Sequence, residues 1–206
     1  LIMGGYHSDG AGIYCINASP TIRNCSFMYC EASRYGGAVT LWVSSARIFN
    51  CQFDSNIATQ CGGGLYATDS HGAITNCRFF GCSAQWGGGL FLNGDGAHQV
   101  NNCLFSGNSA SSIGGAIACA YGVAADFLAC TSSNNSSFSG SGIYVQDCTP
   151  IFTNGILWDE ASNELFLSGA ASLTASYSDI ARPSGVHAGT GNINLDPKFT
   201  SAVSGD

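Results

Sequence analysis

Apolar and polar residues alternate in short runs along this chain, and the runs themselves recur about every 26 residues. A Gly-rich tripeptide precedes an aliphatic residue at successive positions with spacings of 26, 26, 25, 27 and 26. These aliphatic residues are Ile13, Val39, Leu65, Leu90, Ile117 and Ile143. A fixed period of this size predicts a solenoid, in which each unit buries its apolar face by stacking on its neighbours.

Alternation with a period of two divides each unit into three short strands, which lie at residues 12–15, 20–23 and 25–27 of the first regular unit. On the first strand, Ile13 and Cys15 face inward and Tyr14 faces outward. The inward column of the second strand reads Ile22, Ile48, Ile74, Val100, Phe127 and Phe152. The pattern predicts an all-β fold, a right-handed single-stranded parallel β-helix of about eight coils, with its hand set by the crossover rule for parallel strands.

Three residue types keep step with the period and predict ladders inside the helix. Asn tolerates the left-handed conformation that a sharp bend requires, and stacked amides can bond to one another. The Asn ladder comprises Asn24, Asn50, Asn76, Asn102 and Asn154, interrupted by Ala129. The Cys ladder comprises Cys25, Cys51, Cys77, Cys103 and Cys130, and the Phe ladder comprises Phe27, Phe53, Phe79 and Phe105.

The unbroken repeat predicts one domain over residues 1–206, with regular coils in 1–155 and less regular last coils in 156–206. Because the chain starts at Leu1 without a signal peptide, we interpret it as a processed or partial segment of a longer secreted protein.

Composition narrows the range of partners. Only 9% of residues are charged, and the net charge is −7 with six basic residues. Nucleic acid is therefore not expected as a partner, because phosphate binding needs clustered Lys and Arg. No apolar run approaches the roughly 18 residues of a membrane span.

Several segments of the chain resemble two known repeat families. Gly36-Gly37-Ala38-Val39 with Phe53-Asp54-Ser55-Asn56, and Gly114-Gly115-Ala116-Ile117 with Phe105-Ser106-Gly107-Asn108, resemble the passenger repeats of chlamydial polymorphic outer-membrane proteins. The stretch from Asp9 to Cys25 is similar to the right-handed parallel β-helix repeat proteins of bacterial surfaces. The resemblance implies a β-helical surface protein with an adhesive role. The same fold also occurs in structural proteins and in polysaccharide-degrading enzymes.

Candidate catalytic and metal-binding groups are scattered. We expect most of the 11 cysteines to be buried thiols, since stacked Cβ vectors run parallel, and no Cys-x-x-Cys pair indicates a metal site. The histidines His7, His71, His98 and His187 are expected in exposed turns. A carbohydrate-active enzyme would need paired carboxylates in one groove, for which the candidates are Asp69, Asp95 and Asp147. No catalytic residue, metal or cofactor is predicted.

Two surfaces remain as binding candidates. Tyr14, Tyr66, Phe91 and Tyr144 form an outward column that is suited to stacking on sugar rings or on a partner protein. Open strand edges at the two ends of the helix are templates for self-association, including filaments. We therefore expect a non-enzymatic extracellular or cell-surface protein with a structural or adhesive role. The alternatives are a polysaccharide lyase or glycoside hydrolase, and a sugar-binding module.

Overall fold

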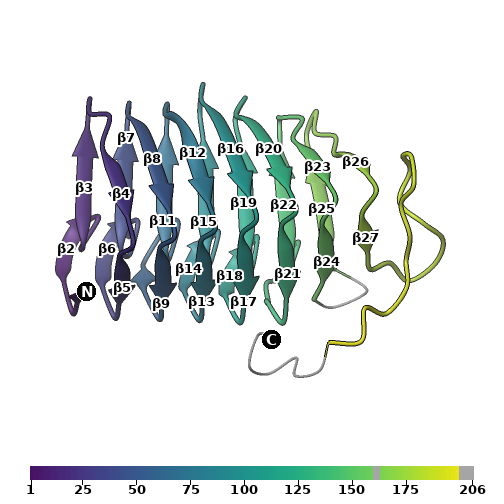
Figure 1. Cartoon of the computed structure of the whole chain (residues 1–206), viewed down its shortest axis with the longest axis horizontal. Coiled ribbons are helices and arrows are strands. Elements are labelled where there is room, and N and C mark those ends of the chain that lie inside the picture. The colour runs from purple at the N-terminus through teal and green to yellow at the C-terminus, as the bar shows by residue number, and fades with distance from the viewer. Residues whose placement is uncertain (160–162, 200–206) are drawn as a thin grey trace.

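The computed structural model describes residues 1–159 and 163–199. Within these residues the regular secondary structure consists of short β-strands only, and all strand pairs are parallel (Figure 1). Strands of the same kind from successive coils pair side by side in four sheets, which we call A to D. Sheets C and D contain seven strands each, so the described chain makes about seven coils rather than the eight that the sequence predicts. The prediction of a parallel β-helix is confirmed.

Each regular coil passes through sheets C, D, A and B in that order. Sheet C contains β3 (Ile13–Ile16), β7 (Val39–Trp42), β11 (Leu65–Thr68), β15 (Leu90–Asn93), β19 (Ile117–Ala120), β22 (Ile143–Gln146) and β25 (Leu165–Ser168). Sheet D contains β4 (Thr21–Arg23), β8 (Ser45–Phe49), β12 (His71–Thr75), β16 (Ala97–Asn101), β20 (Ala124–Leu128), β23 (Ile151–Thr153) and β26 (Thr174–Ser176).

The other two sheets complete the coil. Sheet A contains β1 (Ile2–Met3), β5 (Ser26–Met28), β9 (Gln52–Asp54), β13 (Arg78–Phe80), β17 (Leu104–Ser106), β21 (Thr131–Ser133), β24 (Ile156–Trp158) and β27 (Asp179–Ile180). Sheet B contains β2 (Tyr6–Asp9), β6 (Glu31–Tyr35), β10 (Ile57–Ala58), β14 (Ser83–Trp86) and β18 (Ser109–Ile113).

Sheet B gives the regular coils a fourth strand, where the sequence predicts three. Its strands are mostly polar, and the residue they bury most deeply is small, as at Ala32, Ala58 and Ala110. The apolar alternation that identifies a strand is therefore weak in this part of each repeat.

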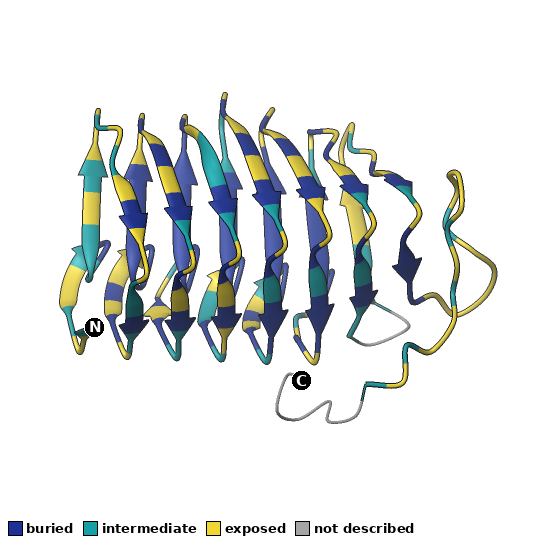
Figure 2. Cartoon of the chain, in the orientation of Figure 1, coloured by how far each residue is buried: buried dark blue, intermediate teal, exposed yellow. Residues whose placement is uncertain are grey.

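The core runs along the axis of the helix as stacked columns of identical or similar side chains. Buried segments recur from coil to coil along the helix (Figure 2). The predicted column on sheet D is confirmed, since Ile22 pairs with Ile48, Ile48 with Ile74, and the register continues to Phe152. The Phe ladder is also confirmed. The rings of Phe53 and Phe79 are stacked at 4.5 Å, and those of Phe79 and Phe105 at 4.8 Å.

The Asn ladder lies at the corner between sheets D and A, but on the outside of the helix. Asn24, Asn50, Asn76 and Asn102 all have φ between 51° and 54°, as the bend requires. The Nδ2 of each later residue donates to the Oδ1 of the one before, over 3.3, 3.3 and 2.8 Å. All four side chains are exposed, so the prediction of an interior ladder is wrong in its placement. At the apex of the bend the side chain points to solvent, and the next residue points inward.

Candidate functional site

The outward residues of sheet C form the column that the sequence predicts as a binding surface. Tyr66 pairs with Phe91 in the next coil, and Tyr144 occupies the same position two coils after Phe91. Tyr14 is 40% exposed, but Tyr66, Phe91 and Tyr144 are at most 7% exposed. The expectation that this column is open is therefore wrong for three of its four residues, and Tyr14 alone presents its ring to solvent.

Side chains at the ends of the sheet B strands cover the column. The Tyr35 ring stacks on Tyr66 at 4.8 Å, and the Trp86 ring lies 6.2 Å from that of Phe91. The register of sheet B shifts between Ala84 and Trp86, an irregularity of the kind that re-aims side chains. The result is a second small core outside the helix, made of Cys61, Tyr66, Phe91, Ala118, Ala120 and Tyr144.

An ion pair lies at the N-terminal end of this external core. The Nη2 of Arg34 donates to Oδ2 of Asp9 over 2.5 Å, and the guanidinium lies 5.6 Å from the centre of the Tyr35 ring. Asp9 is buried, and Asp residues are rarely buried unless they are paired. The sequence shows no spacing that would identify this pair.

The three candidate carboxylates of the sequence do not form a catalytic group. Asp69 and Asp147 are exposed corner residues with φ of 48° and 51°. The Oδ1 of Asp69 accepts a hydrogen bond from the backbone N–H of Asp95, and that of Asp147 accepts one from Ala170. Asp69 and Asp147 therefore cap bends between sheets C and D, each bonded to the following coil.

A buried carboxylate pair that the sequence does not indicate lies near the C-terminal end of the regular coils. The side chains of Asp159 and Glu164 share a hydrogen bond, and the backbone N–H of Asp159 also donates to Oε2 of Glu164 over 2.7 Å. Burial raises the pKa of Asp159 above its ordinary value. A Cβ atom at Gly142 would lie 2.5 Å from Glu164 Oε1 and 3.0 Å from Asp159 Oδ2, so glycine leaves room for the pair.

Asp159 also ends a buried ladder of amides at the corner between sheets A and B. Its Oδ1 accepts from the backbone N–H and Nδ2 of Asn135, and its Oδ2 accepts from Ser132 Oγ, all within 2.7 Å. Retaining and inverting glycosidases hold their carboxylates about 5 to 9.5 Å apart around a sugar. A carboxylate whose two oxygens both accept hydrogen bonds from protein donors, as those of Asp159 do, matches a structural terminus better than that arrangement.

A cavity of about 360 Å³ opens beside Glu164 at the C-terminal end of the helix. Its apolar lining includes Leu165 and Leu167 on β25 and Ile180 at the end of β27. Its polar lining comes from Glu164, Arg182 and His187. Pockets of this size, with apolar walls and a few polar groups, are the usual form of small-ligand sites. The cavity thus joins a buried carboxylate with basic side chains.

His98 is a second buried polar group in an apolar setting. It is 3% exposed and its Nε2 has no hydrogen-bond partner, so the expectation of an exposed turn is wrong for this residue. Desolvation, with a smaller contribution from His71, lowers the pKa of His98 to about 4. The sequence could have predicted the burial of His98. It precedes the inward-facing Val100 by two residues, and residues two apart on a strand face the same side. His7 and His71 are exposed as expected, but they lie on strands β2 and β12 rather than in turns, and His187 is half-buried.

The cysteines are mostly buried thiols, as the sequence predicts. All 11 lie in the described part of the chain and are free, and only Cys15 and Cys25 are partly accessible. Burial raises the pKa of Cys61 to about 12 and that of Cys148 to about 11. The thiols of Cys61 and Cys148 are therefore protonated and unreactive at neutral pH.

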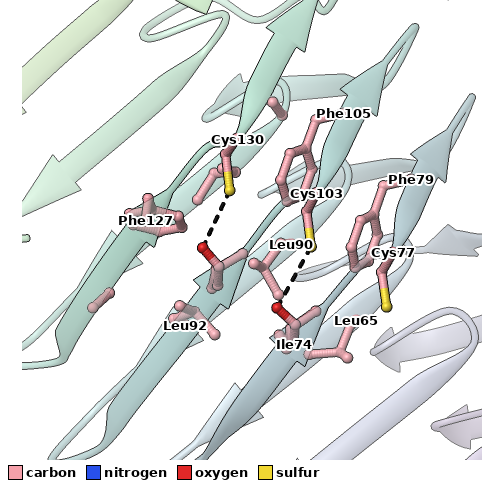
Figure 3. Packing of buried hydrophobic residues seen from close by; sticks show 14 of the residues in the cluster. Leu65, Ile74, Cys77, Phe79, Leu90, Leu92, Cys103, Phe105, Phe127 and Cys130 are labelled. Atoms are coloured by element: carbon pink, nitrogen blue, oxygen red, sulfur yellow. Dashed lines mark hydrogen bonds between the residues drawn. The ribbon is translucent and has the colours of Figure 1, made fainter. Parts of the chain in front are cut away.

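The thiols of the Cys ladder also satisfy main-chain carbonyl groups. Sγ of Cys103 lies 3.5 Å from the carbonyl oxygen of Ile74, and Sγ of Cys130 lies 3.2 Å from that of Val100 (Figure 3). At the corner between sheets A and B, Asn56 and Asn108 bond to carbonyl groups in the equivalent way. The replacement of Asn by Cys30 and Cys82 in that column thus keeps an inward donor at the bend.

Over residues 1–159 and 163–199, no three His, Cys, Asp or Glu side chains are grouped so as to hold a metal ion. The same residues include no helix with the length and apolar character needed to cross a membrane.

Comparison with protein families gives one match. A family model described as "Right handed beta helix region" matches residues 5–131. Neither curated proteins nor solved structures gave a match to the chain.

Proposed function

This chain belongs to the family of right-handed β-helix proteins, and we propose that it is a non-enzymatic protein of the cell surface or extracellular space with a structural or adhesive role. The fold itself is found in surface proteins and in carbohydrate-related proteins. The proposal therefore depends on what this particular helix presents to its surroundings.

The observation that carries the proposal is the exposed Asn ladder. Four amides stack in register along one corner of the helix and bond to one another, so their spacing is fixed by the strand repeat of about 4.8 Å. Each amide keeps further donor or acceptor capacity for a partner. A rigid row of identical polar groups, on a surface with only 9% charged residues, suits a partner that is itself repetitive. Glycan chains are the partner class that we favour.

The test is a binding assay with native protein and immobilised neutral and acidic polysaccharides, in which chain length of the polymer is measured alongside retention. We expect retention without any change in polymer length. Replacing Asn50 and Asn76 by Ser should weaken retention, while replacing the exposed Gln52 by Ser is a matched control on the adjacent face. Loss of polymer length would overturn the proposal, and so would retention that does not depend on the ladder.

If the protein has a structural role, we propose that its copies associate end to end through the open ends of the helix. At the N-terminal end, Leu1, Met3 and Tyr6 are 80%, 63% and 74% exposed beside strand edges that have no partner among the described residues. At the other end, Ile193 pairs with Asp179 at the edge of sheet A, whereas no strand of the described residues pairs with the outer edge of β25. Electron microscopy of native protein should show short head-to-tail filaments. The observation of single particles at all protein concentrations would exclude end-to-end assembly.

The competing function is a carbohydrate-active enzyme, and the cavity beside Glu164 is the observation that favours it. Glu164 would act there as acid or base, with Arg182 and His187 binding an acidic sugar. The assay above separates the two functions, because an enzyme shortens the polymer. Activity that is lost in Glu164→Gln, with binding retained, would establish the enzyme.

A further inference from the structure

Three of the six basic residues of the chain flank the exposed Asn ladder. Arg23 ends β4 directly before Asn24, Arg47 lies on β8, and Arg78 begins β13. Strands β4, β8 and β12 are neighbours in sheet D, and β13 follows β12 across the corner that contains Asn76. All three arginines are exposed. The first three coils of the ladder thus present one guanidinium group per coil.

These three guanidinium groups are not neutralised by the part of the protein that the structure describes. Over residues 1–159 and 163–199, the ion pairs are those of Arg34 with Asp9 and of Lys198 with Asp196. The side chains of the three arginines beside the ladder make neither an ion pair nor a hydrogen bond within the same residues. Their charges therefore remain available to an anion from outside.

The charge beside the ladder has the opposite sign to that of the whole chain. The chain has a net charge of −7. Six strands, β4, β5, β8, β9, β12 and β13, flank Asn24, Asn50 and Asn76, and they contain the three arginines and a single acidic residue, Asp54. The carboxylate of Asp54 accepts a hydrogen bond from its neighbour Ser55. This edge of the helix therefore attracts anions, although the chain as a whole is acidic.

The basic residues and the amides end at the same place. In the coil after Asn102, Ala129 stands where the ladder would continue, and Asp126 occupies the outward column of sheet D that contains Arg47. The segment after β27 turns back from the C-terminal end of the helix (Figure 1), and its Phe199 borders a space of about 280 Å³ together with Asn102 and Ala129. The exposed surface of the ladder thus comprises the four coils up to Asn102.

We propose that the ligand of the Asn ladder is a linear acidic polysaccharide that carries an oxoanion, carboxylate or sulfate, on successive sugars. This inference rests on the proposed binding of glycans by the ladder and specifies their charge. A polymer laid parallel to the helix axis meets one amide and one guanidinium group in each of the first three coils. The planar guanidinium group can donate two parallel hydrogen bonds to an oxoanion, and the amides can donate to and accept from sugar hydroxyl groups.

Nucleic acid fits this surface less well than an acidic polysaccharide. Duplex DNA carries one negative charge per about 1.7 Å of its axis. The arginines beside the ladder recur once per coil, at the strand spacing of about 4.8 Å. Most phosphate charges of DNA would therefore stay uncompensated next to a chain with a net charge of −7. A polysaccharide with one charge on each sugar is less densely charged and needs fewer cations.

The experiment measures the retention of native protein on matched pairs of charged and neutral polymers. The pairs are polygalacturonate with its methyl ester, and dextran sulfate with dextran, and duplex DNA is a further charged polymer. We expect retention on one or both charged polysaccharides and much weaker retention on their neutral partners. The polysaccharide that retains the protein identifies the anionic group. Retention should fall as NaCl is raised from about 0.05 M to about 0.5 M, because salt screens exposed charges.

Arginine variants test whether the charge acts at the ladder. The triple variant Arg23→Gln, Arg47→Gln and Arg78→Gln should bind the charged polysaccharide about tenfold more weakly, as expected for the loss of three exposed charge interactions. Arg47→Gln alone should weaken binding about twofold to threefold. The matched control Gln85→Glu lowers the net charge by the same amount at an exposed position of β14 in sheet B, and it should leave retention unchanged. Circular dichroism verifies the fold of each variant.

The outcomes separate this inference from the proposed function. Equal retention on charged and neutral polysaccharides that still depends on Asn50 and Asn76 would overturn the inference and leave glycan binding in place. Unchanged retention of the triple arginine variant, or retention on DNA as strong as on the polysaccharides, would overturn the inference as well. Retention on none of the polysaccharides, or retention that does not depend on the ladder, would overturn the proposed glycan binding and the inference with it.

Discussion

The buried histidine makes the stability of this β-helix sensitive to acid. His98 faces the interior from β16, in the column that contains Ala46, Gly72 and Ala125 in the neighbouring coils. The imidazole is neutral in the folded chain because charging it there would place an unpaired cation among apolar side chains. In the unfolded chain it is hydrated and accepts a proton at its ordinary pKa.

The size of the effect follows from the two pKa values. The pKa of His98 is about 4 in the folded chain and about 6.5 when exposed. Between these values the unfolded state holds more protons, so the free energy of unfolding falls as the pH drops through 6.5 toward 4. A difference of about 2.5 units corresponds to a loss of about 3 kcal/mol, a large part of the stability of a typical domain.

Urea unfolding of the native chain and of His98→Leu, followed by circular dichroism between pH 8 and pH 4, measures this loss. We expect the two curves to diverge by about 3 kcal/mol as the pH falls, with the leucine variant more stable in acid. Comparison of variants removes the contribution of the carboxylates that both chains share. His7→Gln, at an exposed position, should follow the native curve. Parallel curves for the native chain and His98→Leu would refute the reasoning.

Three further predictions concern the ladders and the carboxylate pair. Phe79→Ala should cost about 3 to 5 kcal/mol in urea unfolding, because it removes a fully buried ring between two stacked rings. The adjacent Phe80, 37% exposed, should cost about 1 kcal/mol or less when changed to Ala, and similar costs would contradict the burial. Ala129→Asn should stabilise by about 0.5 to 1 kcal/mol by extending the exposed ladder at a φ of 54°, and a loss of stability would oppose this. Because burial raises the pKa of Asp159, the native chain should lose stability as the pH rises through that pKa. Asp159→Asn should flatten this loss, and an unchanged curve would exclude Asp159 as its source.

Much of the fold is predictable because a solenoid repeats its packing problem in each coil. Ile48 and Ile74, or Phe53 and Phe79, contact their own kind in the next coil, so the same residue type recurs at the period of the coil. The period therefore predicts the inward columns and the register directly. The polar strands of sheet B carry no such apolar signal, and the prediction omits them.

The candidate sites were less predictable, since they depend on contacts between parts of the repeat that have no common phase. Alternation places Tyr66 on the outer face of sheet C, which is correct, but the side chains of Tyr35 and Trp86 then cover that face. The pair of Asp159 and Glu164 comes together where the regular repeat ends, so no period links its members.

The sequence by itself determined the β-helix, its period and the identity of the stacked columns, because stacking identical units demands identical residues at identical phases. Only the tertiary structure decided which outward residues meet solvent. Tyr14 and the Asn ladder are exposed, whereas Tyr66 and Phe91 are buried in a second core. The physical reason is that strand alternation specifies the direction of a side chain relative to its own sheet, while burial depends on how the next sheet of the coil bends toward it.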